Sequence, residues 1–296
     1  GSYDFAIWAS DTNGNWNSTA GSFVVENTLP PAAPFVLDAY LTGPKWEDVA
    51  LTWLLSSDDG MGSEDVVRYD IYRNVTAYDG LGMGYQLHDS VPAGMFTYLD
   101  SGAGEGNPED FFYYVCAVDS ANMSACSSGQ MGKITHHLLT GPQLISIPLV
   151  QKDPSIEKVL QTLIFDYAWA YDNSATTDEW IAFSVSKPYD GSMQTIDRRK
   201  AVWVNVTTES NMTVAGVVPK KTIINLTRGW NLVGYPSFHN KAASDALEGV
   251  PFERLEGFDQ LASPYFLRVL DDSSVFAACH GYWILVQTDS SWTLVN

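Results

Sequence analysis

The sequence is poor in basic residues. It contains 16 Lys and Arg against 35 Asp and Glu, which gives a formal net charge of −19 over 296 residues. Such a balance repels nucleic acid and anionic membrane surfaces, and only residues 197–200 are locally basic. The sequence also lacks an apolar run of about 18 residues and a recognisable signal peptide. We therefore expect no nucleic-acid partner and no direct membrane insertion, and a secreted form would be an internal or processed part of something longer.

Signatures of catalysis and of cofactor binding are missing as well. The chain has three cysteines and no CxxC pair, zinc-ligand spacing or haem motif. It has no GxSxG elbow, and its histidines form no HxxxH or HxH pair. Paired carboxylates of the glycosidase type are conceivable in so acidic a chain, but nothing places two of them at a working separation. We expect no enzyme, no catalytic residue and no cofactor, and a secreted hydrolase is the least favoured alternative.

The cysteines and the glycosylation sequons favour an extracellular location. Cys116 and Cys126 lie symmetrically about a turn expected at residues 120–122, so paired strands would bring their Cα atoms within about 5.5 Å, suitable for a disulfide. Cys279 is left over. Asn-X-Ser/Thr sequons occur three times as often as the roughly two expected by chance, at Asn17, Asn74, Asn122, Asn205, Asn211 and Asn225. Both features are typical of oxidising compartments.

Most of the chain reads as short alternating strands separated by Gly, Asn, Asp, Ser and Pro clusters, which predicts an all-β protein. The C-terminal part of the chain is an internal duplication of one unit. Residues 201–214 align without a gap on residues 281–294, with Trp203 on Trp283, and residues 143–148 align on 231–236. We expect copies at 134–219 and 220–296, each a β-rich unit with one short helix, at 153–163 (N-cap Asp153) and at 240–250 (closed by Gly249).

Residues 31–133 carry about seven strands and resemble a fibronectin type III domain. The resemblance is carried by Pro34 and by residues 51–53, 69–73, 98–100 and 113–119. It implies a β-sandwich over 30–133, in which alternation places Trp53 and Tyr69 inside and Thr52 and Asp70 outside. Tyr113 or Tyr114 would supply a tyrosine-corner hydroxyl.

The N-terminal 3–25 segment resembles only the F strand and the FG turn of an immunoglobulin-like or type III domain, with Asp11 falling on Asp119. We therefore assign 1–29 to a partial hairpin and its linker. An isolated hairpin is marginal in water, so it should pack against something. It is either a fragment of a longer stalk or a strand pair lent to an adjacent subunit.

The duplicated unit resembles a module found beside type III domains in archaeal and some bacterial secreted or surface-layer-associated proteins. Residues 229–232 (GWNL) and 281–283 (GYW) carry most of this resemblance, while the first copy departs from it at Pro142 and Ala201. The resemblance implies no particular activity.

The segments that could supply cation ligands are most simply explained as turns of the chain. Residues 11–15 (DTNGN) have the alternate-oxygen spacing that Ca²⁺ favours, but they lack the downstream bidentate acid. The acidic pairs are expected to be solvated loops: Asp58-Asp59, Glu64-Asp65 and Asp271-Asp272. His136 and His137 are neighbours on a strand and should face opposite sides, so they cannot chelate one ion. We expect no metal site, with Ca²⁺ as the alternative.

The ten tryptophans leave two functions open. Trp53, Trp203 and Trp283 alternate as core residues, Trp16 and Trp46 adjoin turns, and Trp230 and Trp292 are candidates to seal the two copies together. Exposed aromatic rings can stack on sugars, which keeps a carbohydrate-binding module as the alternative. The sequence favours an extracellular structural or adhesive protein of a cell surface, envelope or appendage, partnered by copies of itself or neighbouring surface proteins and capable of forming filaments.

Overall fold

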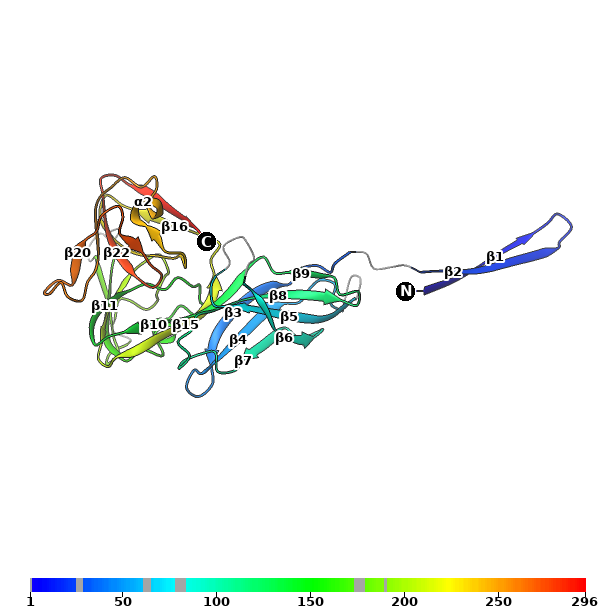
Figure 1. Ribbon diagram of the computed structural model, residues 1–296, viewed down its shortest axis with the longest axis horizontal. Coiled ribbons are helices and arrows are strands. Elements are labelled where there is room, and N and C mark those ends of the chain that lie inside the picture. The colour runs from blue at the N-terminus through cyan, green and yellow to red at the C-terminus, as the bar shows by residue number, and fades with distance from the viewer. Residues whose placement is uncertain (1, 25–28, 61–64, 78–83, 173–178, 189–190) are drawn as a thin grey trace.

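The structure is a computed structural model that describes residues 2–24, 29–60, 65–77, 84–172, 179–188 and 191–296. Its described residues form antiparallel β-sheets with two one-turn helices, which confirms the all-β fold class. Figure 1 shows an N-terminal hairpin that projects from the rest of the molecule, followed by a sandwich and then by the paired C-terminal units. The hairpin is built of β1 (Ser2–Ser10) and β2 (Trp16–Val24).

The sandwich has the strand order of a type III-like fold. One sheet runs β3-β4-β7, and the facing sheet runs β10-β8-β5-β6 with β9 beside β8. Its core contains Trp53, whose ring lies 5.7 Å from that of Tyr69, and the fully buried Tyr113. The strand bounds are β3 (Phe35–Thr42), β4 (Asp48–Leu54), β5 (Val66–Asn74), β6 (Gln86–Pro92), β7 (Thr97–Asp100), β8 (Phe111–Asp119), β9 (Ser124–Cys126) and β10 (Gln130–Leu138).

One strand belongs to both the sandwich and the first copy. β10 pairs at its start with β8 (Met131 opposite Tyr113) and over its whole length with β15 (Ser210–Val218), the last strand of the first copy. β15 therefore becomes the edge strand of the sandwich sheet. The boundary expected between residues 133 and 134 falls inside β10, because this strand buries Met131 in the sandwich core and Ile134 in the core of the first copy.

The two copies fold alike, strand for strand. In each, a strand that begins at a left-handed glycine (Gly141 or Gly229) pairs with the tryptophan-bearing strand, and a third strand joins after the same register shift. The first copy contains the shared β10, β11 (Gly141–Ile145), α1 (Ile156–Val159), β12 (Phe165–Tyr171), β13 (Trp180–Ser184), β14 (Val202–Val206) and β15, and its bridge between Ser155 and Thr195 corresponds to the pair β18 and β21 of the second copy. The second contains β16 (Lys221–Leu226), β17 (Gly229–Gly234), β18 (Lys241–Ala242), α2 (Ala243–Ala246), β19 (Phe252–Phe258), β20 (Leu267–Val269), β21 (Val275–Phe276), β22 (Gly281–Val286) and β23 (Ser290–Val295).

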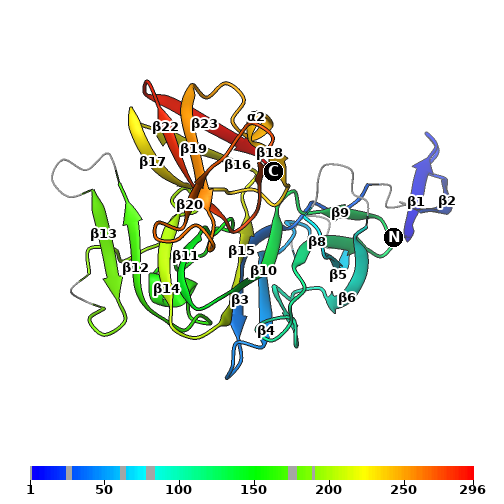
Figure 2. The same ribbon diagram turned by 60° about the vertical axis from the view of Figure 1, so that its left-hand side comes forward.

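The copies face each other across a pseudo-two-fold axis. The Ser146 N–H donates to the Cys279 carbonyl at 2.9 Å, and the equivalent Gly234 N–H donates to the equivalent Arg199 carbonyl at 3.0 Å. Reciprocal contacts of this kind define an isologous interface, here formed within one chain. Figure 2 shows the second-copy strands stacked on those of the first.

Both helices are shorter than the sequence pattern predicts. Each is a single turn, and the residues before them, Ser155 and Ala242, make no side-chain cap. Asp153 accepts a hydrogen bond from the Ser155 N–H at 3.0 Å instead of capping a helix that starts at Pro154. Residues 160–163 continue as a turn in which the Leu163 N–H donates to the Leu160 carbonyl at 3.0 Å, and they bury Leu160 and Leu163 in the core of the first copy. Gly249 adopts the left-handed φ of 78° that a chain reversal requires.

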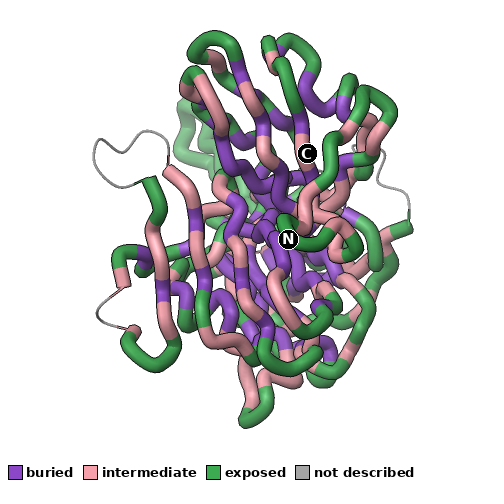
Figure 3. Tube along the Cα trace, turned by 90° about the vertical axis from the view of Figure 1, so that its left-hand side faces the viewer, coloured by how far each residue is buried: buried purple, intermediate pink, exposed green. Residues whose placement is uncertain are grey.

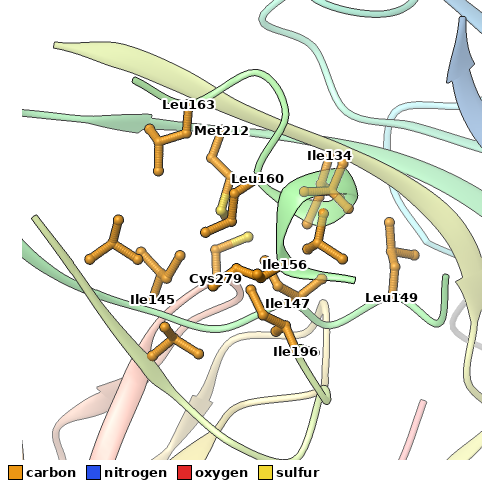
Figure 4. Close-up of a cluster of buried hydrophobic side chains, with 14 of the residues drawn as sticks. Ile134, Ile145, Ile147, Leu149, Ile156, Leu160, Leu163, Ile196, Met212 and Cys279 are labelled. Carbon is orange, nitrogen blue, oxygen red and sulfur yellow. The ribbon is translucent and has the colours of Figure 1, made fainter. Parts of the chain in front are cut away.

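Figure 3 shows buried positions gathered toward the middle of the molecule in this view, with exposed positions around them. The core of the first copy draws side chains from all three units, since Phe112 of β8 and Cys279 of the second copy lie in it and Phe238 packs against it. Figure 4 shows Ile134, Met212 and Cys279 around one apolar cluster with Leu160, the residue that follows α1. These shared contacts join the sandwich and both copies through apolar packing.

Candidate functional site

An aromatic cluster lies at the seam between the copies. Trp283 of β22 is at its centre, with ring centroids 5.1 Å from Tyr171, 5.9 Å from Trp180 and 6.2 Å from Trp230. We call these four residues the seam aromatic cluster. Trp180 is 45% exposed, and the other three are half-buried. The cluster therefore presents ring edges and faces to solvent from both copies.

The positions of these tryptophans differ from the sequence interpretation. Trp203 and Trp283 are half-buried seam residues, whereas Trp292, which we expected at the seam, is 1% exposed inside the second copy. Its indole N–H donates to the Ala246 carbonyl at 2.6 Å. Adjacent residues of a strand face opposite sides, so an alternating sequence shows that a strand has two different faces. It does not show which face packs inside its own unit and which face meets the other copy. Trp230 does lie at the seam.

A polar pocket of about 440 Å³ adjoins the seam aromatic cluster. Tyr171, Leu232 and Ile224 supply its apolar wall, and Asp172, Asn225 and Asn231 supply polar groups. The Lys200 ammonium pairs with the Asp172 carboxylate there. The Thr227 hydroxyl is buried at the pocket and has no hydrogen-bond partner in the described structure. Aromatic faces next to carboxylate, amide and hydroxyl groups are the chemistry that binds sugars.

At the pseudo-symmetric position on the opposite side of the seam, two histidine rings are in contact. His280 stands where the first copy has Lys200, and His136 stands where the second copy has Ile224. Their rings meet edge to face at 5.1 Å. Burial, then the neighbouring His280, lowers the pKa of His136 to about 4, so its ring is neutral at pH 7. His137 faces the other way, toward Glu209 at 3.0 Å, as strand alternation predicts.

A second pocket of about 540 Å³ lies between the outer face of the sandwich and the first copy. Asp38 of β3 lines it, and burial raises the pKa of this carboxyl. The amide groups of Gln151 and Gln161 each place one buried atom there without a hydrogen-bond partner in the described structure. Lys158 lies over the Trp46 ring at 5.4 Å, so Trp46 is half-buried by the first copy. This pocket marks the join of two units.

Inside the sandwich, Asp100 holds a buried polar network. Its carboxylate accepts a hydrogen bond from the Tyr113 hydroxyl at 2.8 Å and pairs with Arg73 at 2.8 Å and with His88 at 3.2 Å. Of the two expected tyrosine-corner candidates, Tyr113 is therefore the inward residue, and its partner is a side chain. Burial raises the pKa of Tyr113. Asp70 lies outside the apolar core as predicted, but Ser90 and Arg68 bond to it, which leaves it only 5% exposed.

The acidic sequence candidates form turns. Asp11 accepts hydrogen bonds from the Asn15 side-chain amide and from the backbone N–H groups of Asn15 and Asn13, and these bonds hold its pKa low. Asp59 accepts from Tyr69, Asp58 from the Ala32 N–H, and Asp271 from Ser273. Glu64 lies outside the described residues. Within the described ranges no three His, Cys, Asp or Glu side chains are grouped to hold a metal ion.

The disulfide and the sequons all lie in the described part of the chain. Cys116 and Cys126 are opposite each other on β8 and β9, with Cα atoms 3.8 Å apart, and form a disulfide. Cys279 is free and buried, and burial raises the pKa of its thiol. Among the sequon asparagines, Asn17, Asn122 and Asn225 are exposed, and Asn74, Asn205 and Asn211 are half-buried. All three half-buried amides have side-chain partners, Thr76 for Asn74, Asp166 for Asn205 and His137 for Asn211.

No protein-family model matches this chain, and no curated protein matches it. Among solved structures, the crystal structure of the chicken CNTN1 FN1–FN3 domains is similar at 12% sequence identity. The match covers 90% of this chain and 98% of that chain, with a TM-score of 0.23. This similarity is too low to bear on function, so the type III-like description of the sandwich rests on its strand order. Among the described residues, no helix has the length and apolar character needed to cross a membrane.

Proposed function

We propose that this chain is an extracellular structural or adhesive segment of a cell-surface or appendage protein, acting through domain and subunit contacts. The observation that carries the proposal is the pair β10 and β15. These two nine-residue strands pair over their full length and connect the sandwich to the first copy within one sheet. A spacer needs units that do not hinge against each other, and a shared strand meets that need.

Two further features support the proposal. The disulfide and the six sequons suit an oxidising, glycosylating compartment. The second copy is held by reciprocal backbone hydrogen bonds and by packing of Phe238 on Phe112, 5.0 Å between ring centroids. The described residues of the sandwich and of both copies are therefore packed together by contacts between each neighbouring pair of units.

The proposal is tested on the polypeptide in its native source. Immunogold labelling and negative-stain electron microscopy of whole cells and of the medium should find the protein in an ordered layer or filament at the cell surface. Mass spectrometry of its peptides should find glycans on the exposed sequons, at Asn17, Asn122 and Asn225. Unglycosylated, dispersed protein inside the cell would refute it.

A second candidate function is glycan binding at the seam. The observation that favours it is the seam aromatic cluster beside the polar pocket. Titration with soluble polysaccharides should quench tryptophan fluorescence, and Trp180→Ala should abolish the change. Trp16→Ala is the matched control, because Trp16 is 69% exposed but lies on the N-terminal hairpin. Equal loss of the signal in both variants, or no signal at all, would exclude binding at this site.

A further inference from the structure

The N-terminal hairpin, β1 and β2, has the same turn conformation and strand register as the β8 and β9 hairpin of the sandwich. The Asp11 carboxylate accepts from the N–H groups two and four residues later, at 2.8 and 2.9 Å. The Asp119 carboxylate does the same with Ala121 and Met123, both at 2.8 Å. In both turns the third residue after the aspartate donates its N–H to the aspartate carbonyl at 3.1 Å and has a left-handed φ, 81° at Gly14 and 61° at Asn122.

The strands on either side of the two turns are paired in the same register. Trp8 lies opposite Ser18, and the residues at the same distances from Asp119, Cys116 and Cys126, lie opposite each other. The equivalence therefore covers the turn and both adjoining strand ends, and it fixes which face of β1 corresponds to which face of β8.

The face of β1 that corresponds to the buried face of β8 is apolar and uncovered. Tyr3, Phe5 and Ile7 occupy the positions of Phe111, Tyr113 and Val115. The three β8 residues are at most 7% exposed, whereas the three β1 residues are 42 to 59% exposed. Phe23 stacks on Tyr3 at 5.5 Å and enlarges the apolar face across to β2. The hairpin thus has the inner face of a sandwich without the sheet that belongs against it.

In the complete sandwich, the apolar face of β8 is covered by the sheet β3-β4-β7. All three of these strands precede β8 in the chain: β3 starts 76 positions before Phe111, and β7 ends 11 positions before it. After the hairpin ends at Val24, a ten-residue segment leads to β3, the first strand of the sandwich, at Phe35. The equivalence therefore defines the missing sheet, its apolar inner face and its position in sequence.

We propose that the hairpin is the C-terminal hairpin of a second type III-like sandwich, and that a three-stranded apolar sheet formed by preceding strands of the same polypeptide covers Tyr3, Phe5 and Ile7. The chain would then contain the junction between tandem sandwiches. This inference rests on the hairpin equivalence and is independent of the proposed function. Its occupant is a β-sheet of the kind formed by β3, β4 and β7.

Hydrogen-exchange mass spectrometry tests the proposal on two samples, the 296-residue chain and the polypeptide isolated from its native source. Peptides covering residues 3–9 should exchange at least about 100-fold more slowly in the native polypeptide than in the 296-residue chain. Peptides of β8 serve as the reference, because their protection should be the same in both samples. Equal, fast exchange of residues 3–9 in both samples would overturn the proposal.

The source of the covering sheet is tested on the native polypeptide by dilution and by substitution. Protection of residues 3–9 should persist on dilution to nanomolar concentration, and its loss there would assign the sheet to another subunit and refute the proposal. Ile7→Asp should abolish the protection, whereas Ala6→Asp, on the opposite face, should retain it. Equal effects of the two substitutions would contradict the assigned inner face. Unchanged protection of β8 shows that both variants remain folded elsewhere.

Discussion

Gly281 and Ala201 occupy equivalent positions in the two copies and meet at the pseudo-two-fold axis. A Cβ atom added to Gly281 would lie 2.3 Å from the Ala201 Cβ and 2.8 Å from the Leu144 Cγ. Neither distance is possible for real carbon atoms, so Gly281→Ala must push the copies apart or displace Leu144. Overpacking of this kind costs about 1–3 kcal/mol, and we expect a loss of about 2 kcal/mol in the free energy of unfolding.

The compensating substitution makes the test specific. Ala201→Gly alone removes one buried methyl group, about 0.8 kcal/mol, and loosens the backbone by roughly 0.5–1 kcal/mol. In the double variant, the methyl group enters the same space from the other copy, so the clash with the Ala201 Cβ atom disappears and only the close approach to the Leu144 side chain remains. We expect the double variant to lose about 1–2 kcal/mol, where simple addition gives about 3.5 kcal/mol.

Urea unfolding followed by far-ultraviolet circular dichroism and tryptophan fluorescence measures these differences, since Trp203 and Trp283 lie at the seam. A double variant whose loss equals the sum of the two single losses would refute the reasoning. It would mean that Gly281 and Ala201 do not face each other and that the copies are not joined as described.

Three further predictions follow from buried groups. The unfolded chain binds a proton at His136 below pH 6.5, while the folded chain does so only near pH 4, so the free energy of unfolding should fall by about 3 kcal/mol as the pH drops through this window. His136→Phe should remove this part of the fall when urea unfolding is measured at a series of acid pH values. Burial lowers the pKa of Lys133 in the folded chain to about 8, so its protonated form destabilises the fold and this loss is recovered as the pH rises from 8 to 10.5. Over this range the unfolding free energy of the wild type should rise by about 3 kcal/mol relative to that of Lys133→Met. Replacing both Cys116 and Cys126 by alanine opens a short loop and should lower the stability of the sandwich by roughly 2–3 kcal/mol in thermal unfolding, and an unchanged midpoint would argue against the cross-link.

The duplication and the strand content could be predicted from sequence because they depend on local pattern. Trp203 and Trp283 fall at matching positions, and the structure gives their strands the same partners and the same register shift. The buried Trp53 and Tyr69 likewise follow from alternation and from turn residues on both sides. Local signals of this kind survive in any tertiary context that buries one face of a strand.

The joining of the units could not be predicted, because it depends on which surfaces meet. Nothing in residues 130–138 indicates that β10 pairs with β8 on one side and with a strand some 80 residues later on the other. The seam aromatic cluster has the same origin: Trp180 and Trp283 are about 100 positions apart, and only the stacking of the copies brings them together. Two signals were available: Trp230, which was a candidate for the seam and lies there, and Gly281, where a glycine stands in place of the equivalent Ala201 and permits close approach.

The helices show how packing overrides a local pattern. Residues 153–163 contain an acidic N-cap candidate, a proline and a helical apolar spacing, yet only Ile156–Val159 is helical. Ser155 pairs instead with Thr195 as an isolated bridge, and the Ile156 N–H donates to the Gln194 carbonyl. The strand segment that supplies these bonds lies 40 residues away and cannot be read from the helix sequence.

The most direct test of the central claim is the unfolding of single molecules under force, pulled through Leu29 and Asn296. If β10 and β15 fuse the sandwich to the first copy, residues 35–218 should unfold in one event that releases roughly 60 nm of chain at about 3.5 Å per residue. The second copy should account for one further, shorter event of roughly 25 nm. Three separate events, none longer than about 35 nm, would show that the units unfold independently and would contradict the account.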